Sequence, residues 1–181
     1  MSEYEWISDD IFTVSDFLEP SECEDYIRTS ESRGFGDAPI STSAGPIMMK
    51  DVRNNSRVMV DDPSLAKLVW ERATLYVPRT LAGHRAVGVN ERFRFYRYDP
   101  GQTFRWHQDG YFERPNRERS RLTLMVYLND DFEGGETRFE QAVIKPVKAT
   151  ALFFVHHLLH EGAEVKRGRK YVLRTDVMYS G

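Results

Sequence analysis

Residues 92–98 read Arg-Phe-Arg-Phe-Tyr-Arg-Tyr, and Asp99-Pro100-Gly101 follows them directly. Polar and aromatic side chains alternate along this stretch, which is typical of a β-strand with one buried face. The Asp-Pro-Gly sequence then predicts a turn. We therefore expect the chain to enter a β-rich region near residue 90.

Short apolar runs separated by glycine-containing turns continue to the end of the chain. Strands are predicted at residues 122–128, 136–139, 151–155 and 171–179, with turns at residues 133–135 and 167–169. Several short strands preceded by helices are typical of an antiparallel sandwich or jelly roll. The predicted fold class is therefore mainly β, with the helices packed on one outer face of the sheets (α+β).

The first 89 residues carry the helical signals. Asp62 and Pro63 suit the N-cap and the first position of a helix, and apolar residues recur at helical spacing from there to Pro78. An earlier helix begins at Pro20 and ends at the glycines of residues 34–36. The remaining elements expected are an extended segment at residues 11–18, a loop at residues 37–49 and a short strand within residues 51–60.

Size and charge narrow the class of protein. A chain of 181 residues, without repeats or a linker-like tract, fits one domain over residues 1–181, with residues 1–89 as a helical support and residues 90–181 as a catalytic core. The formal net charge of −3 argues against a protein that neutralises nucleic acid. No apolar run reaches the ~18 residues that a membrane-spanning helix needs.

Two features favour the cytoplasm as the compartment. The first six residues, Met-Ser-Glu-Tyr-Glu-Trp, have neither the basic nor the apolar part of a secretory signal. Cys23 is the only cysteine, so it cannot form a disulfide within the chain.

Three side chains suggest a metal site. His107 and Asp109 are two residues apart, so they share a face if the strand before them continues that far. His160 follows some fifty residues later, where a jelly roll can bring it opposite the first pair. Two imidazoles and one carboxylate are the ligand set of non-haem Fe(II) oxygenases, which leave positions open for small molecules. The alternative is surface histidines beside a solvated aspartate.

Lys170 lies at the start of the last predicted strand. On this strand Val172, Arg174 and Asp176 share the face of Lys170, while the other face is almost entirely apolar. A cavity that holds a dicarboxylate needs a buried cation, because an unpaired buried charge is costly. Lys170 fits that need, and a surface lysine at the end of a turn is the alternative.

At this point the sequence resembles the Fe(II)- and 2-oxoglutarate-dependent dioxygenases, in particular the prolyl 4-hydroxylase-like branch. The motifs that carry the resemblance cover residues 90–181 and occur in the expected order: Arg97-Tyr98-Asp99-Pro100-Gly101-Gln102, His107-Gln108-Asp109, Val126-Tyr127-Leu128-Asn129, Gly134-Gly135-Glu136-Thr137, and His160-Glu161-Gly162 with Val165, Gly168 and Lys170.

The resemblance implies a double-stranded β-helix in which His107, Asp109 and His160 hold Fe(II). It implies that Lys170 binds 2-oxoglutarate, with Arg174 and then Arg169 as the other candidates. Tyr98 and Tyr127 are implied as hydroxyls near this cosubstrate, although packing in the core would explain each tyrosine nearly as well.

The implied reaction is hydroxylation of a C–H bond with O2, which releases succinate and CO2, and ascorbate is the expected reductant for the iron. The implied substrate is a prolyl peptide, an amino acid or another small molecule. Because relatives that halogenate have a small residue in place of the carboxylate, Asp109 favours hydroxylation.

Two other interpretations stay open. A jelly-roll metal protein with a hydrolytic or ligand-binding role could use the same three ligands with zinc. His156, His157 and His160 also form an HHxxH cluster, but the apolar run before it predicts a strand, and the glutamate of HExxH is missing. We expect His156 and His157 to have a structural or ligand-orienting role. The basic segment at residues 114–121 is predicted to be a solvated loop or a lid.

Overall fold

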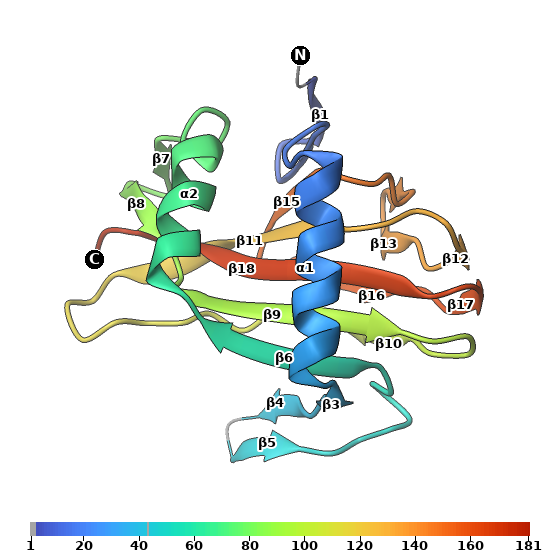
Figure 1. Ribbon diagram of the computed structural model, residues 1–181. Helices are drawn as coiled ribbons and strands as arrows, with labels where there is room; N and C mark the ends of the chain where they lie inside the picture. The colour runs from blue at the N-terminus through green and yellow to red at the C-terminus, as the bar shows by residue number, and fades with distance from the viewer. Residues whose placement is uncertain (1–2, 43) are drawn as a thin grey trace.

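The computed structural model describes residues 3–42 and 44–181, and within these residues ten strands form a major antiparallel sheet (Figure 1). In spatial order they are β1 (Tyr4–Ser8), β2 (Ile11–Val14), β15 (Ala151–Val155), β11 (Arg119–Tyr127), β18 (Lys170–Tyr179), β9 (Arg92–Tyr98), β6 (Ser56–Asp61) and β3 (Gly36–Asp37), with β8 (His84–Val89) beside β18 and β7 (Thr80–Leu81) beside β8.

The remaining described strands form a minor sheet and two isolated pairs. The minor sheet runs through β10 (Phe104–His107), β16 (His160–Gly162), β13 (Thr137–Phe139) and β14 (Val143–Ile144). The pairs are β12 (Glu133–Gly134) with β17 (Val165–Arg167), and β4 (Ile40–Thr42) with β5 (Gly45–Ile47). A mainly β antiparallel fold with helices on one side confirms the predicted class.

Both helices, α1 (Pro20–Arg33) and α2 (Pro63–Ala73), lie on the same side of the major sheet (Figure 1). The side chain of Asp62 caps α2 by accepting a hydrogen bond from the backbone N–H of Leu65 at 2.9 Å. The prediction extended this helix to Pro78, but it ends at Ala73, and residues 74–77 form turns and a bend before the proline. In the described part of the chain neither helix has the length and apolar character to cross a membrane.

Strand alternation divides the interior into two cores. On β15, Phe153 faces the helices and stacks on Phe12, with 4.6 Å between ring centroids. Its neighbour Phe154 points to the other side and packs against Phe139 of the minor sheet, with 5.1 Å between the ring centroids. One core therefore lies between the helices and the major sheet, and the other lies between the two sheets.

The last strand, β18, shows the same division, with one face toward the helices and the other toward the minor sheet. Tyr171, Leu173 and Val177 belong to the core under the helices, as the alternation predicted. Lys170 and Arg174 project from the opposite face, where they line a cavity between the sheets.

The N-terminal half differs from the prediction in its strands. The extended segment expected at residues 11–18 and the short strand expected within residues 51–60 correspond to β2 and β6. Four further strands that were not predicted, β1, β3, β7 and β8, also join the major sheet. The segment at residues 37–49, predicted to be a loop, contains the β4–β5 hairpin. β3 and β7 have two residues each, and β8 pairs with the distant β18, so local patterning shows these strands poorly.

Candidate active site

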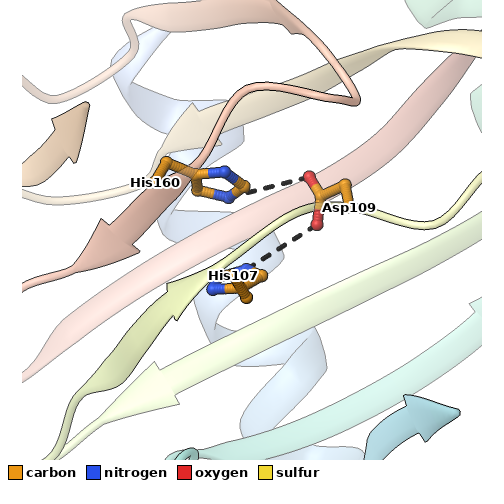
Figure 2. A group of neighbouring side chains, drawn as sticks. All are labelled: His107, Asp109 and His160. Atoms are coloured by element: carbon orange, nitrogen blue, oxygen red, sulfur yellow. Dashed lines mark ion pairs between the residues drawn. The ribbon is translucent and has the colours of Figure 1, made fainter. Parts of the chain in front are cut away.

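His107 and His160 are direct cross-strand partners, because β10 and β16 pair antiparallel in the minor sheet. Asp109 was expected to share the face of His107 if the strand continued that far, but β10 ends at His107, so strand alternation does not orient the carboxylate. Instead the backbone N–H of Asp109 donates to the carbonyl oxygen of His156 at 3.1 Å. The turn held in this way directs Asp109 toward both histidines (Figure 2).

The three side chains converge on one point. Asp109 Oδ1 lies 3.8 Å from His107 Nε2, and Asp109 Oδ2 lies 3.8 Å from His160 Nε2. One ligand atom from each residue falls within 4.8 Å of the others, a spacing that a single metal ion could bridge (Figure 2).

Backbone carbonyls fix the orientation of both imidazoles. His107 Nδ1 lies 2.6 Å from the carbonyl oxygen of Arg105, and His160 Nδ1 lies 2.9 Å from that of Leu158. A carbonyl oxygen only accepts hydrogen bonds, so each Nδ1 carries a proton, and in the neutral form of the ring Nε2 keeps a free lone pair. This is the arrangement that metal-binding histidines use.

Electrostatics keeps His107 and Asp109 ready to bind a metal at neutral pH. Burial, together with the nearby His160, lowers the pKa of His107 to about 4. Burial also opposes ionisation of Asp109, but the guanidinium of Arg174, 3.1 Å from Oδ2, together with the two histidines and the Thr123 hydrogen bond outweighs it and holds the pKa of this carboxyl well below its usual range. His107 is therefore neutral and Asp109 is ionised.

A hydrogen-bonded chain extends behind Asp109. The Thr123 hydroxyl lies 2.6 Å from Asp109 Oδ2 and 3.0 Å from His156 Nδ1. His156 Nε2 lies 2.9 Å from the hydroxyl of Ser120. His156 is thus buried behind the three ligands, whereas His157 is exposed, and neither joins them in the metal-sized cluster found among the described residues.

Lys170 lies deeper in the same cavity, where only 2% of its surface is exposed. Its Nζ donates to the carbonyl oxygen of Gly135 at 2.7 Å and lies over the rings of Tyr98 and Tyr127, 5.1 and 5.5 Å from their centroids. No carboxylate among the described residues pairs with it. Burial lowers its pKa to about 7. An unpaired buried ammonium of this kind is suited to an anionic ligand.

The two tyrosines differ in what their hydroxyls contact. Tyr127 shares a 2.7 Å hydrogen bond with the hydroxyl of Thr137, and Tyr98 lines the cavity beside Gly162. Burial raises the pKa of each, so both are neutral phenols.

The other cationic candidates have carboxylate partners. Arg174 lines the cavity but pairs with Asp109 and Asp176, both at 3.1 Å. Arg169 lies at the surface, half exposed, and pairs with Asp99. Arg114, from the basic segment, is 2.7 Å from Glu91 and 2.6 Å from Glu118. Lys170 is thus the free cation among these four.

Sequence reasoning missed several residues of the site. Thr123 and Ser120 carry no local signal, since Thr123 meets Asp109 and His156, and Ser120 meets His156, only in the folded chain. Arg94 and Tyr96 could have been found, because they occupy the cavity face of the strand whose alternation was recognised. Arg53 precedes β6 in an irregular segment and gives no signal.

These residues fit a non-haem iron centre. Two free imidazole nitrogens and an ionised carboxylate form an open nitrogen and oxygen donor set, which suits Fe(II). The unpaired ammonium of Lys170 lies in the same cavity, where the distal carboxylate of 2-oxoglutarate would need a cation.

Comparison with known proteins agrees with this geometry. The sequence model of the 2OG-Fe(II) oxygenase superfamily matches residues 93–175, which include all three candidate ligands and Lys170. Prolyl 4-hydroxylase 1 of Arabidopsis thaliana is 25% identical, over 89% of this chain and 66% of its own length.

Solved structures share the fold. A viral collagen prolyl hydroxylase from Paramecium bursaria Chlorella virus-1, solved with 2OG, has a TM-score of 0.66 and 23% identity over 94% of this chain and 97% of its own. A Trichoplax adhaerens prolyl hydroxylase, solved with a hypoxia inducible factor peptide, has a TM-score of 0.71 and 14% identity over 94% and 84%. The chain is thus similar to the 2OG-Fe(II) oxygenase superfamily over residues 93–175, and the relatives it resembles include prolyl 4-hydroxylases.

Proposed function

We propose that this protein is an Fe(II)- and 2-oxoglutarate-dependent dioxygenase that hydroxylates a C–H bond. The observation that carries the proposal is the convergence of His107, Asp109 and His160 within 4.8 Å, in one cavity with the unpaired Lys170. In this proposal the triad holds Fe(II), and Lys170 holds the distal carboxylate of 2-oxoglutarate. When bound, the iron and its cosubstrate supply the oxidising power for hydroxylation by O2, with release of succinate and CO2.

The residues of the chain position these groups and control the environment. Leu158 and Arg105 carbonyls hold the imidazoles with Nε2 toward the metal, and Thr123 orients the carboxylate of Asp109. The rings of Tyr98 and Tyr127 lie against the ammonium of Lys170. They would shield from water the ion pair between this ammonium and the distal carboxylate of the cosubstrate. Arg174 keeps Asp109 ionised.

The relatives indicate two classes of substrate. A prolyl peptide is the first candidate, because the Trichoplax relative was solved with a peptide, and an amino-acid-like small molecule is the second. We further propose that residues 1–181 act as one catalytic domain, with residues 1–89 supporting residues 90–181. The cytoplasm remains the proposed compartment on account of the single, buried Cys23.

A spectroscopic titration tests the proposal. Under nitrogen, Fe(II) with 2-oxoglutarate is expected to give the visible metal-to-ligand charge-transfer band, and Zn(II), whose filled d shell is not readily oxidised, is expected to give none. Admission of air is expected to release succinate. Both signals are expected to vanish in His107→Ala and to persist in His157→Ala, whose histidine is exposed. Metal-dependent hydrolysis without succinate release would instead favour a hydrolytic metal protein.

A further inference from the structure

A second, wider cavity meets the inner one at the candidate metal ligands. The outer cavity has a volume of about 500 Å³ and the inner one a volume of about 40 Å³. His107, Asp109, Tyr96, Phe104 and Arg174 line both. The proposed cosubstrate would occupy the side of Lys170, so the outer cavity is the route by which another molecule reaches the metal.

The outer cavity is rich in arginine. Arg53, Arg57, Arg94 and Arg174 line it, from the segment before β6 and from strands β6, β9 and β18. Two carboxylates, Asp109 and Asp176, line the same cavity, so the arginines outnumber them there although the net charge of the whole protein is −3. The cavity therefore has a local positive potential that the overall charge does not predict.

Two of the arginines are already neutralised. Asp176 lies 3.1 Å from Arg174 and 3.4 Å from Arg94. Arg53 and Arg57 form no ion pair with any residue that the structure describes. Burial and the positive charges of Arg53, Arg94 and Arg174 lower the pKa of Arg57, so these groups repel one another.

Arg53 is the more unusual of the two because it is 96% buried, with 4% of its surface exposed. Its Nε donates to Asn55 Oδ1 at 2.8 Å, and its guanidinium lies 4.5 Å from the ring centroid of Tyr96 and 4.3 Å from that of Phe104. Its Nη2 finds no hydrogen-bond partner among residues 3–42 and 44–181. Stacking between aromatic rings explains how the guanidinium is held in place, but it leaves Nη2 and the positive charge unsatisfied.

We propose that Arg53 and Arg57 form an anion subsite that binds a carboxylate of the molecule to be hydroxylated. A planar guanidinium matches a carboxylate through paired N–H donors, and a desolvated site strengthens that interaction. The assignment rests on the proposed function, which makes the outer cavity a substrate site. The carboxylate belongs either to a free amino-acid-like substrate or to an acidic residue of a peptide.

Acid and amide pairs of probes test the subsite. The protein, loaded with Fe(II) and saturated with 2-oxoglutarate under nitrogen, is titrated with N-acetyl-L-proline and its primary amide, with acetate and acetamide, and with two pentapeptides that carry Glu or Gln beside a central Pro. Binding is followed by saturation-transfer NMR and calorimetry. We expect at least one acid to bind roughly 10- to 100-fold more tightly than its amide, as expected for loss of a charge-assisted hydrogen bond. The pair that discriminates identifies the source of the carboxylate.

Variants assign the effect to the two arginines. Arg57→Gln is expected to remove most of the difference in affinity between acid and amide. Arg53→Lys keeps the positive charge but loses the paired N–H donors of the guanidinium, so it is expected to reduce that difference. Arg92→Gln is the matched control. Arg92 lies on β9, the strand that also contributes Arg94 to the outer cavity, but its guanidinium pairs with Asp61 at the surface. Arg53→Gln is included only if its circular dichroism matches the parent protein.

The proposal is overturned if acids and amides bind alike, if no probe binds, or if Arg57→Gln discriminates as well as the parent. A missing charge-transfer band would instead contradict the proposed oxygenase function. The acid and amide titrations are then repeated on the metal-free protein, where a difference that depends on Arg57 still supports an anion subsite and equal binding still refutes it.

Discussion

The Thr123 hydroxyl lies 2.6 Å from Oδ2 of Asp109 and also reaches His156 Nδ1 at 3.0 Å. Since Oδ2 is the oxygen that faces His160, this hydroxyl fixes the carboxylate in the orientation that the metal requires. We expect Thr123→Val, which keeps the shape and removes the hydroxyl, to weaken metal binding roughly 10- to 100-fold, as other losses of ligand-orienting partners do.

Calorimetric titration with Co(II) under nitrogen measures that effect. Thr123→Ser restores a hydroxyl at the same position and is expected to recover most of the affinity. Equal affinity in Thr123→Val and the parent protein would show that Asp109 is oriented by other contacts.

The two neighbouring histidines make a matched pair for the metal site. His160→Ala removes a ligand and is expected to lower Co(II) affinity by roughly 100-fold or more, because the remaining two donors form an incomplete site. His157→Ala removes an exposed imidazole three residues away and is expected to change nothing. Comparable losses in both variants would contradict the assignment of His160.

Binding of 2-oxoglutarate is expected to depend on pH through Lys170. Burial lowers the pKa of Lys170 to about 7, and only the ammonium form attracts the distal carboxylate. Affinity is therefore fully present below pH 7 and falls as the pH rises, by up to about tenfold per unit until the pKa of the complex is reached. Titrations between pH 6.5 and 8.5 measure the slope.

Lys170→Arg is the control for that slope, because guanidinium stays protonated throughout this range. Its affinity is expected to change with pH much less than that of the parent protein. Tyr96 faces the same cavity, so Tyr96→Phe is measured in parallel to separate its contribution. A steep slope that survives in Lys170→Arg would assign the effect to another group.

One of the nine tyrosines is expected to ionise well below the others. Burial opposes ionisation of Tyr96, but Arg174, Arg53 and Arg94 outweigh it and lower its pKa to about 8. Ultraviolet difference spectra of the metal-free protein, recorded from pH 6 to 10, are expected to show a tyrosinate transition near pH 8. The transition is expected to disappear in Tyr96→Phe and to stay in Tyr98→Phe, since burial raises the pKa of Tyr98.

Two glycines with positive φ separate backbone strain from steric clash. Gly83 (φ +83°) has open space at its Cβ position, so Gly83→Ala is expected to lower the free energy of unfolding by about 1 kcal/mol. Gly134 (φ +76°) faces the backbone oxygen of Glu164, and Gly134→Ala is expected to cost on the order of 3 kcal/mol or more. Urea unfolding measures both, and equal losses would show that the β12–β17 pair yields to the added methyl.

The alternation of residues 92–98 and of the last strand was sufficient to predict a mainly β fold and to place Lys170 and Arg174 on one face. Alternation is a local property that a single strand already displays, so it can be read without knowing the partner strands. The same local logic failed for the β4–β5 hairpin and for β1, whose strands have five residues or fewer, and it left open whether the strand before His107 reaches Asp109, which it does not.

The sequence by itself determined which residues are chemically able to form the site: two imidazoles, one carboxylate and one lysine in a recognisable order. Only the tertiary structure decided that His107 and His160 are cross-strand partners, that Lys170 pairs with no carboxylate of the described residues, and that Arg53 and Arg57 share a cavity with the candidate metal ligands. The pairing of strands, the burial of charged groups and the charge balance of a cavity depend on which distant strands lie side by side. The order of residues along the chain does not say how far apart two strands lie in the folded protein.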